Sequence, residues 1–338
     1  MKILVLKRDK VGDLLLATPM LRVLRAGLPD ARIEVVASDY NAWVLEGNRD
    51  VDRVWVYRRS RIGRRISAAG ALQQVALFAR LRFEGFDAAI AAGGEASPRA
   101  TRRARLVGAK RTIAYVPAGE ARSPDALGEP AYGHERDRVI ALLAPLGVAA
   151  PSPPPPPTYA PPAAVLEGAR GWLGENGLEP GRFAVIGLGA RRAKRQPDAQ
   201  QVLRWGAWLR EAHGLDTVFM WTPGATDNPQ YPGDDPIAAP VLAAKPAWLH
   251  PFRGALLPAI GLVWHARASI FPDSGLMHFA AASPGGVLGL FAEREASPPP
   301  ERWGPLGHNA AILEAPVRIA DVDDAQFAAA MRSLLRAR

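Results

Sequence analysis

The stretch that decides the fold is ILVLKRDKVGD, at residues 3–13. It begins with an apolar run typical of a buried strand, Gly12 then permits a tight turn, and apolar residues recur at helical spacing from Leu14 to Leu28. Residues 32–37, 54–57 and 86–91 repeat the strand pattern, and residues 67–83 repeat the helical one. Strands that alternate with helical segments of this length predict a parallel sheet with crossover helices.

The second half of the chain repeats this alternation. Strand-like runs occupy residues 182–187, 217–221, 268–271 and 287–291, and helical patterns occupy 197–213, 255–267 and 276–282. Between the halves, residues 151–162 read PSPPPPPTYAPP, which is compatible with neither a helix nor a central strand. We therefore expect two α/β domains, at residues 1–150 and 163–320, joined by a semi-rigid proline-rich linker at 151–162. The alternative is a surface loop within one domain.

Composition excludes several classes of protein. The chain has 338 residues, 48% of them hydrophobic, and no cysteine. A disulfide scaffold, a thiolate metal site, a cysteine nucleophile and an iron–sulfur cluster are therefore excluded. No apolar run approaches the roughly 20 residues that span a bilayer, and the N-terminus lacks the features of a signal peptide. We expect a soluble cytoplasmic protein.

Charge is distributed unevenly along the chain. The net charge of +9 lies entirely in residues 1–150, whereas residues 151–338 are neutral. Two clusters dominate: Arg58, Arg59, Arg61, Arg64 and Arg65; and Arg99, Arg102, Arg103, Arg105, Lys110 and Arg111. A one-sided distribution indicates a surface that meets an anion. Anionic lipid and a phosphorylated or carboxylated substrate fit; nucleic acid is disfavoured because the clusters lack interleaved aromatic residues.

Asp13 follows the first predicted strand, and ligands of open α/β sheets bind outside the carboxyl ends of strands. A carboxylate is also favoured at a helix N-terminus by the unpaired N–H groups there. Position alone therefore leaves helix capping and catalysis equally open for Asp13.

The run DSGLMH at residues 273–278 occupies the equivalent place in the second half. The helix N-terminus after Ser274 is suited to an anion, Gly275 lets a ligand approach the backbone, and His278 shares a helical face with Ser274. The alternative is a helix cap beside a packed histidine.

Residues 188–195 (LGARRAKR) form a basic loop after a predicted strand, and Gly189 and Lys194 in this loop suit a diphosphate. A Walker loop and a G-x-G-x-x-G fingerprint are absent, and the alternative is a solvated cationic loop. The six histidines show no zinc-binding spacing. Asp234 and Asp235 fit either a divalent ion or a turn, and we favour the turn.

Three motifs together resemble glycosyltransferase family 9, the bacterial ADP-heptose:lipopolysaccharide heptosyltransferases. Residues 9–22 (DKVGDLLLATPMLR) resemble its N-terminal signature, residues 273–282 (DSGLMHFAAA) its C-terminal signature, and KRQP at 194–197 the end of its basic loop. The resemblance implies an α/β GT-B architecture, in which two Rossmann-like domains with parallel sheets face a cleft. The N-terminal domain would take the acceptor and the C-terminal domain the nucleotide-sugar, and a C-terminal helix at 321–338 would pack back on the N-terminal domain.

The resemblance also implies inverting transfer with no cofactor and no metal. Asp13 would be the general base, Lys194 and Ser274 would hold the diphosphate of ADP-heptose, and Asp273 would contact the heptose. Gly189, Trp221, Gly275 and His278 complete the implied donor site, and Arg58, Arg61, Arg64 and Arg65 form the implied acceptor site. The implied partners are ADP-heptose, a Kdo–lipid A or heptosylated core acceptor, and the inner leaflet of the bacterial inner membrane, where the protein would be peripheral.

The chain departs from the family pattern at several positions. Gln196 stands where tryptophan is frequent, and residues 291–293 (FAE) differ from the usual Phe-Gly run. Residues 221–228 lack the common glutamate. The alternatives are a glycosyltransferase of the same fold with another donor or acceptor, a GT-B-like epimerase, and a non-catalytic anion-binding module.

Overall fold

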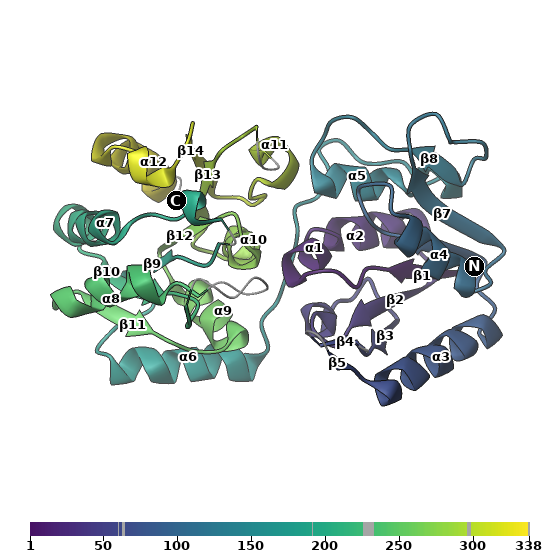
Figure 1. The fold of residues 1–338 in the computed structure, drawn as a ribbon, viewed down its shortest axis with the longest axis horizontal. Helices are drawn as coiled ribbons and strands as arrows, with labels where there is room; N and C mark the ends of the chain where they lie inside the picture. Colours follow the sequence, from purple (N-terminus) through teal and green to yellow (C-terminus); the bar gives the residue numbers. More distant parts are fainter. Residues whose placement is uncertain (60, 63–64, 191, 226–232, 296–298, 337–338) are drawn as a thin grey trace. The chain divides into compact units, whose positions relative to one another are not determined.

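A computed structural model describes the whole chain except residues 60, 63–64, 191, 226–232, 296–298 and 337–338. The chain divides into two compact units, Met1–Ala160 and Pro161–Arg338 (Figure 1). This boundary falls within the predicted linker.

The first unit is built on a six-stranded parallel sheet with the order β3-β2-β1-β6-β7-β8. Ile3 in the central strand β1 is paired with Ile33 on one side and Ala88 on the other. The strands are β1 (Lys2–Leu6), β2 (Arg32–Ser38), β3 (Arg53–Tyr57), β6 (Ala88–Ala91), β7 (Arg111–Val116) and β8 (Ala126–Gly128). This is the doubly wound order, in which the chain reverses direction across the sheet between β1 and β6. Two short strands, β4 (Arg61–Ile62) and β5 (Arg65–Ile66), pair separately as an antiparallel hairpin.

The helix predicted over residues 14–28 is in fact two helices. These are α1 (Val11–Leu15) and α2 (Thr18–Gly27), with Pro19 in the first turn of α2. A proline ring clashes with the carbonyl four residues earlier and offers no N–H, so a single helix cannot continue through it. The Thr18 hydroxyl donates to the Leu15 carbonyl over 2.8 Å and closes the break. The remaining helices of this unit are α3 (Ala68–Phe83), α4 (Pro98–Leu106) and α5 (Glu135–Ala141).

The proline-rich segment is attached to the first unit. The Thr158 N–H donates to the Thr18 hydroxyl over 3.0 Å, and the Arg136 guanidinium donates to the Pro154 carbonyl over 3.3 Å. The Tyr159 ring contacts the Trp43 ring edge-on, with centroids 5.9 Å apart. Residues 154–159 therefore lie along the surface of the first unit.

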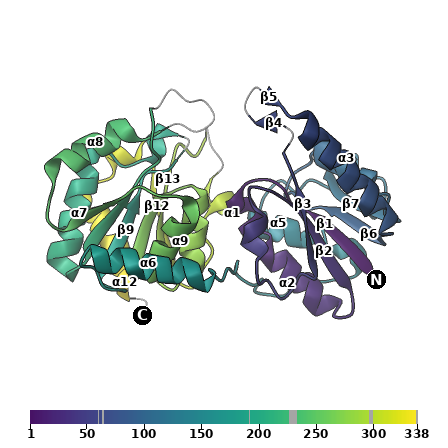
Figure 2. The same ribbon diagram turned by 90° about the horizontal axis from the view of Figure 1, so that it is seen from below.

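The second unit repeats the topology of the first, with the order β11-β10-β9-β12-β13-β14. Its strands are β9 (Phe183–Gly187), β10 (Asp216–Met220), β11 (Leu249–Phe252), β12 (Ala268–Pro272), β13 (Val287–Ala292) and β14 (Ala310–Ala315). Its helices are α6 (Ala163–Glu175), α7 (Ala199–His213), α8 (Asp235–Ala244), α9 (Leu256–His265), α10 (Gly275–Ala282), α11 (Pro300–Trp303) and α12 (Asp324–Arg336). Buried residues of α7, α8 and α12 pack on one face of the sheet, and those of α6, α9 and α10 on the other. Figure 2 shows α7, α8 and α9 around the strands β9, β12 and β13.

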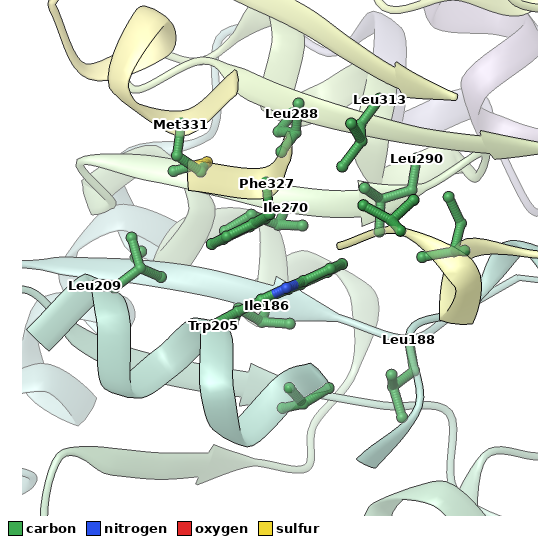
Figure 3. Packing of buried hydrophobic residues seen from close by; sticks show 14 of the residues in the cluster. Ile186, Leu188, Trp205, Leu209, Ile270, Leu288, Leu290, Leu313, Phe327 and Met331 are labelled. Atoms are coloured by element: carbon green, nitrogen blue, oxygen red, sulfur yellow. The ribbon is translucent and has the colours of Figure 1, made fainter. Parts of the chain in front are cut away.

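The buried face of the C-terminal helix packs within the second unit, and the expected contact of this helix with the N-terminal domain stays a prediction. Phe327, Met331 and Leu334 lie at helical spacing and join the core cluster that also contains Trp205 and Leu209 of α7. Figure 3 shows Phe327 and Met331 beside these α7 residues. The Phe327 ring stacks on the Trp205 ring with centroids 4.3 Å apart and planes 1° apart. Burial of each such side chain stabilises the fold by about 1.5–3 kcal/mol, which fixes the helix on this core. The stacking on Trp205 of α7 places this apolar stripe on the core of the second unit.

Among the helices that the structure describes, none is both long enough and apolar enough to span a membrane.

Candidate active site

Both sheets have a point where the strand order reverses, and this is where doubly wound proteins bind ligands. In the first unit the point lies after β1 and β6, and Asp13 belongs to the helix that follows β1. In the second unit it lies after β9 and β12. Gly189 and Lys194 follow β9, and residues 273–275 follow β12. The structure therefore places the predicted catalytic carboxyl and the predicted phosphate-binding residues at equivalent points of two repeated sheets.

Asp13 is the third residue of α1, and Lys10 occupies the N-cap position. The Asp13 carboxylate accepts the Lys10 backbone N–H over 3.3 Å, so it braces the turn from inside the helix. Burial raises the pKa of Asp13 above its ordinary value; Lys7 opposes this rise and Asp9 adds to it. A carboxylate with a raised pKa is a stronger base than an exposed one.

A buried ion pair that sequence reasoning missed lies beside this carboxyl. The Lys7 ammonium is buried, 3.5 Å from carboxylate oxygens of both Glu135 and Asp9. Burial pushes the pKa of Lys7 down, but Glu135, Asp9 and Asp13 outweigh it, so the pKa is raised. Lys7 therefore stays charged. The sequence gives only a weak indication that Lys7 is buried, namely that it directly follows the apolar run ending at Leu6.

Glu135 joins this pair to the loop after β6. Its carboxylate accepts the Gly94 N–H over 3.0 Å, and a Cβ on Gly94 would lie 2.2 Å from the other carboxylate oxygen. A side chain at position 94 would therefore displace the Glu135 carboxylate from this position. No local sequence pattern marks Glu135, which reaches the site as the first residue of α5.

In the second unit, the basic loop is tied to the ends of two strands. The Lys194 ammonium lies 2.7 Å from the Glu293 carboxylate, which follows β13. The buried guanidinium of Arg195 forms an ion pair with Asp273, directly after β12, and lies 5.5 Å from the Phe291 ring centroid. The sequence predicted Lys194 as the functional cation and gave Arg195 no role. The structure shows that Arg195 holds Asp273.

Ser274 occupies the N-cap position of α10 but makes no capping hydrogen bond. Its hydroxyl is buried and has no hydrogen-bond partner among the described residues. The backbone N–H groups at the start of this eight-residue helix are thus not satisfied by Ser274, which favours an anion site over the capping alternative. His278, four residues on, is buried in the same helix.

Asp234 and Asp235 brace a loop. Asp234 accepts the Gln196 amide over 2.6 Å and the Thr222 N–H over 2.8 Å, and burial raises its pKa. Asp235 accepts the Trp221 indole N–H and the Gly224 N–H, each over 2.9 Å. Their contacts fit the turn interpretation. Within the described part of the chain, no group of three or more His, Cys, Asp or Glu side chains is placed to hold a metal ion.

Trp221 directly follows β10, and its ring stacks on Phe219 with centroids 5.5 Å apart and planes 18° apart. Its half-buried indole therefore has a fixed position at the edge that also carries Gly189 and Lys194.

The structure describes little of the predicted acceptor site. Arg58 is exposed, and Arg61 and Arg65 belong to the β4–β5 hairpin. Arg64 and the side chains of Arg61 and Arg65 lie outside the described residues. In the second basic cluster, Lys110 is paired with Asp87 over 2.7 Å. The acceptor site remains a prediction.

Comparison with known proteins agrees with this arrangement. The model of glycosyltransferase family 9 (heptosyltransferase) matches residues 252–323. No match was found among the curated proteins.

Among solved structures, the chain is similar to a family 9 glycosyl transferase from Veillonella parvula, with a TM-score of 0.79, 20% identity, and coverage of 100% of this chain and 98% of that one. E. coli ADP-heptose lps heptosyltransferase II gives a TM-score of 0.72 at 20% identity, covering 99% of each chain. E. coli heptosyltransferase WaaC with ADP gives 0.71 at 17% identity, covering 99% of this chain and 100% of that one. The chain therefore has the GT-B-like α/β fold of these heptosyltransferase structures through both units, and residues 252–323 of its second unit match the family 9 model.

Proposed function

We propose that the protein transfers a heptose, with inversion and without a metal ion, from ADP-heptose to the Kdo/heptose inner core of lipopolysaccharide. The observation that carries the proposal is the chemical difference between two equivalent points of a repeated fold. The first unit presents a carboxyl with a raised pKa, Asp13. The second presents an ammonium, Lys194, and a helix start that its N-cap serine leaves uncapped.

The second unit suits the donor. As the bond between the sugar and the diphosphate breaks, ADP gains negative charge, which cations and backbone N–H groups stabilise. Lys194 and the N-terminus of α10 supply both, and the buried hydroxyl of Ser274 has a hydrogen bond to donate. Asp273, held by Arg195, is the group for the sugar hydroxyls. Gly189, Trp221, Gly275 and His278 complete the proposed donor site. The E. coli relative whose structure was solved with ADP-2-deoxy-2-fluoro heptose binds a donor of this class.

The first unit suits the acceptor. In a single displacement, the acceptor oxygen bonds to the anomeric carbon of the heptose while its proton passes to the Asp13 carboxylate. The bond from that carbon to the diphosphate breaks, and ADP leaves on the opposite face, so the configuration inverts. The positive charge of Lys7 opposes the rise in the pKa of Asp13 that burial causes, and so favours the ionised carboxylate that accepts the proton.

The charge of the first half suits an anionic glycolipid. Residues 1–150 carry the entire net charge of +9, and Kdo and lipid A bring carboxylates and phosphates. Arg58, Arg61, Arg64 and Arg65 are the proposed contacts. The same charge would draw the protein to the cytoplasmic face of the inner membrane, where this acceptor lies.

A donor and acceptor panel tests the proposal. Purified protein should transfer heptose from ADP-heptose to Kdo–lipid A or heptosylated core, and should bind ADP more tightly than UDP or GDP. Lys194→Ala should weaken ADP binding, because a charge-assisted contact is worth about 1.5–3 kcal/mol. Transfer from a different nucleotide-sugar, with none from ADP-heptose, would replace the proposed donor by the same-fold alternative.

A further inference from the structure

Glu293 has an unusual backbone conformation for its residue type. It directly follows β13 and has a φ of +56°. That left-handed region is uncommon for residues other than glycine, and the surrounding structure must hold such a residue there. A glutamate at this position therefore calls for an explanation in its side chain.

The side chain of Glu293 reaches the predicted phosphate-binding lysine. One carboxylate oxygen lies 2.7 Å from the Lys194 ammonium, across 99 positions of sequence. The lysine side chain is 50% exposed and the glutamate side chain 18% exposed, so the pair is open to solvent on the lysine side. The neighbouring cation, Arg195, is engaged with Asp273 instead.

We propose that Glu293 is an internal stand-in for a donor phosphate, which holds Lys194 until the nucleotide-sugar binds and takes it back when the nucleoside diphosphate leaves. The inference rests on the proposed function, because it takes Lys194 as the phosphate contact. Binding is then an exchange of anions on one ammonium. The Glu293–Lys194 contact is lost and a phosphate–Lys194 contact replaces it.

The exchange has a predictable direction. The half-exposed Lys194 side chain is open to an incoming phosphate, and Glu293 also lines an open cavity of 580 Å³ with Arg294 and Glu314, away from Lys194. Arg294 is paired with Glu314 over 2.7 Å, so it does not compete with Lys194 for the Glu293 carboxylate. Competition from Glu293 lowers the affinity for every ligand that uses Lys194, product as well as donor. It therefore favours product release, a step that limits many enzymes.

Titration calorimetry with ADP tests the inference on the full-length protein. Glu293→Gln removes the charge and should tighten ADP binding about two- to fivefold, the range expected for a partly exposed ion pair. Glu293→Gly should give the same gain, and glycine accepts the left-handed backbone, so this variant keeps the test valid if Glu293→Gln folds poorly. The matched control is Glu295→Gln, which removes the same charge from an exposed position two residues away.

Lys194→Ala and the double variant Lys194→Ala/Glu293→Gln complete the cycle. If Glu293 competes with phosphate for Lys194, the gain in ADP affinity from Glu293→Gln should disappear in the variant that lacks Lys194. Unchanged or weaker ADP binding in both Glu293 variants overturns the inference, and so does an equal gain in Glu295→Gln or a gain that survives without Lys194. If Lys194→Ala alone leaves ADP affinity unchanged, the proposed donor site itself fails. That failure differs from the case in which Lys194 matters and Glu293 does not.

Discussion

Replacement of Asp13 by asparagine separates its structural role from its chemical one. The carboxylate accepts the Lys10 N–H over 3.3 Å, and an asparagine side-chain oxygen can accept the same bond. The variant should therefore keep the turn between β1 and α1. It should lose the ability to take a proton from the acceptor hydroxyl. General base catalysis contributes about 10²–10⁴ in rate, or about 3–5 kcal/mol of barrier, and kcat should fall by that factor.

The direction of the change in stability on Asp13→Asn follows from the raised pKa of Asp13. Burial raises the pKa of Asp13 in the folded protein, so at pH values between the unfolded and folded pKa the folded state binds more protons. Wild-type stability contributed by this group is therefore lost as pH rises through that interval, and the loss is complete above the folded pKa. Asparagine does not ionise. At neutral pH, Asp13→Asn should be at least as stable as the wild type.

The assay measures three quantities on wild type and variant. These are the melting temperature at several pH values, the Kd for ADP, and kcat for transfer to the glycolipid acceptor. We expect an equal or higher melting temperature, unchanged ADP binding and a kcat reduced by at least 100-fold, the lower limit for loss of a general base. A stable variant with near wild-type kcat would refute the role of Asp13 as base and leave it a structural brace of the turn.

Three further predictions concern the pH profile, the core and the acceptor. The double variant Lys7→Met/Glu135→Gln removes both members of a buried ion pair. Because Lys7 lowers the pKa of Asp13, the acid limb of the pH profile of kcat/KM should move to higher pH in this variant. An acid limb at the wild-type pH would contradict the coupling between Lys7 and Asp13. Phe327→Ala should lower the free energy of unfolding in urea by about 3–5 kcal/mol and leave ADP binding unchanged, whereas a small loss would mean that the C-terminal helix contributes little to this core. Arg61→Glu should raise the KM for the acceptor and weaken its dependence on salt without altering the Kd for ADP; a collapse of ADP binding instead would oppose the assignment of this cluster to the acceptor.

The fold was largely predictable because its central strands are continuous apolar runs. Residues 3–6 and 268–271, for example, lie within β1 and β12. Edge strands such as β8, with its partly exposed residues, carry no such run and were missed. The C-terminal helix was predicted only from the resemblance to family 9, and its buried face packs on the core of the second unit. Its apolar stripe specifies that a partner exists, whereas the identity of that partner depends on the position of Trp205 in the folded unit.

Candidate site residues could be predicted from the sequence where they follow a predicted strand. Asp13, Lys194 and Ser274 each come just after a strand, where ligands of such sheets bind. Lys7 and Glu135 are 128 positions apart, and Arg195 and Asp273 are 78 apart. Neither pair has a local signature, because each is specified by tertiary packing.

The two units differ in chemistry although they share a strand order. In each, a buried cation is neutralised by a carboxylate: Lys7 by Glu135 in the first unit, and Arg195 by Asp273 in the second. Removal of one partner from such a pair leaves an uncompensated buried charge, so these pairs fix the loops around them. In the proposed mechanism, the group that acts on the substrates lies outside the buried pair and carries the opposite sign in each unit. It is the carboxyl of Asp13 in the first and the ammonium of Lys194 in the second.

Under the proposed function, this division would let one topology, used twice, serve two halves of one reaction. A group that gives up or accepts charge during turnover would disturb a loop that depended on that charge. The bond from the Lys10 N–H to Asp13 does not depend on it, because a neutral side-chain oxygen can accept the same bond. In the proposed mechanism, the structural charges belong to Lys7 and Arg195, so Asp13 could take a proton and Lys194 could exchange Glu293 for a phosphate. Substitution of the structural pairs should therefore lower stability together with activity. Substitution of Asp13 or Lys194 should lower activity alone.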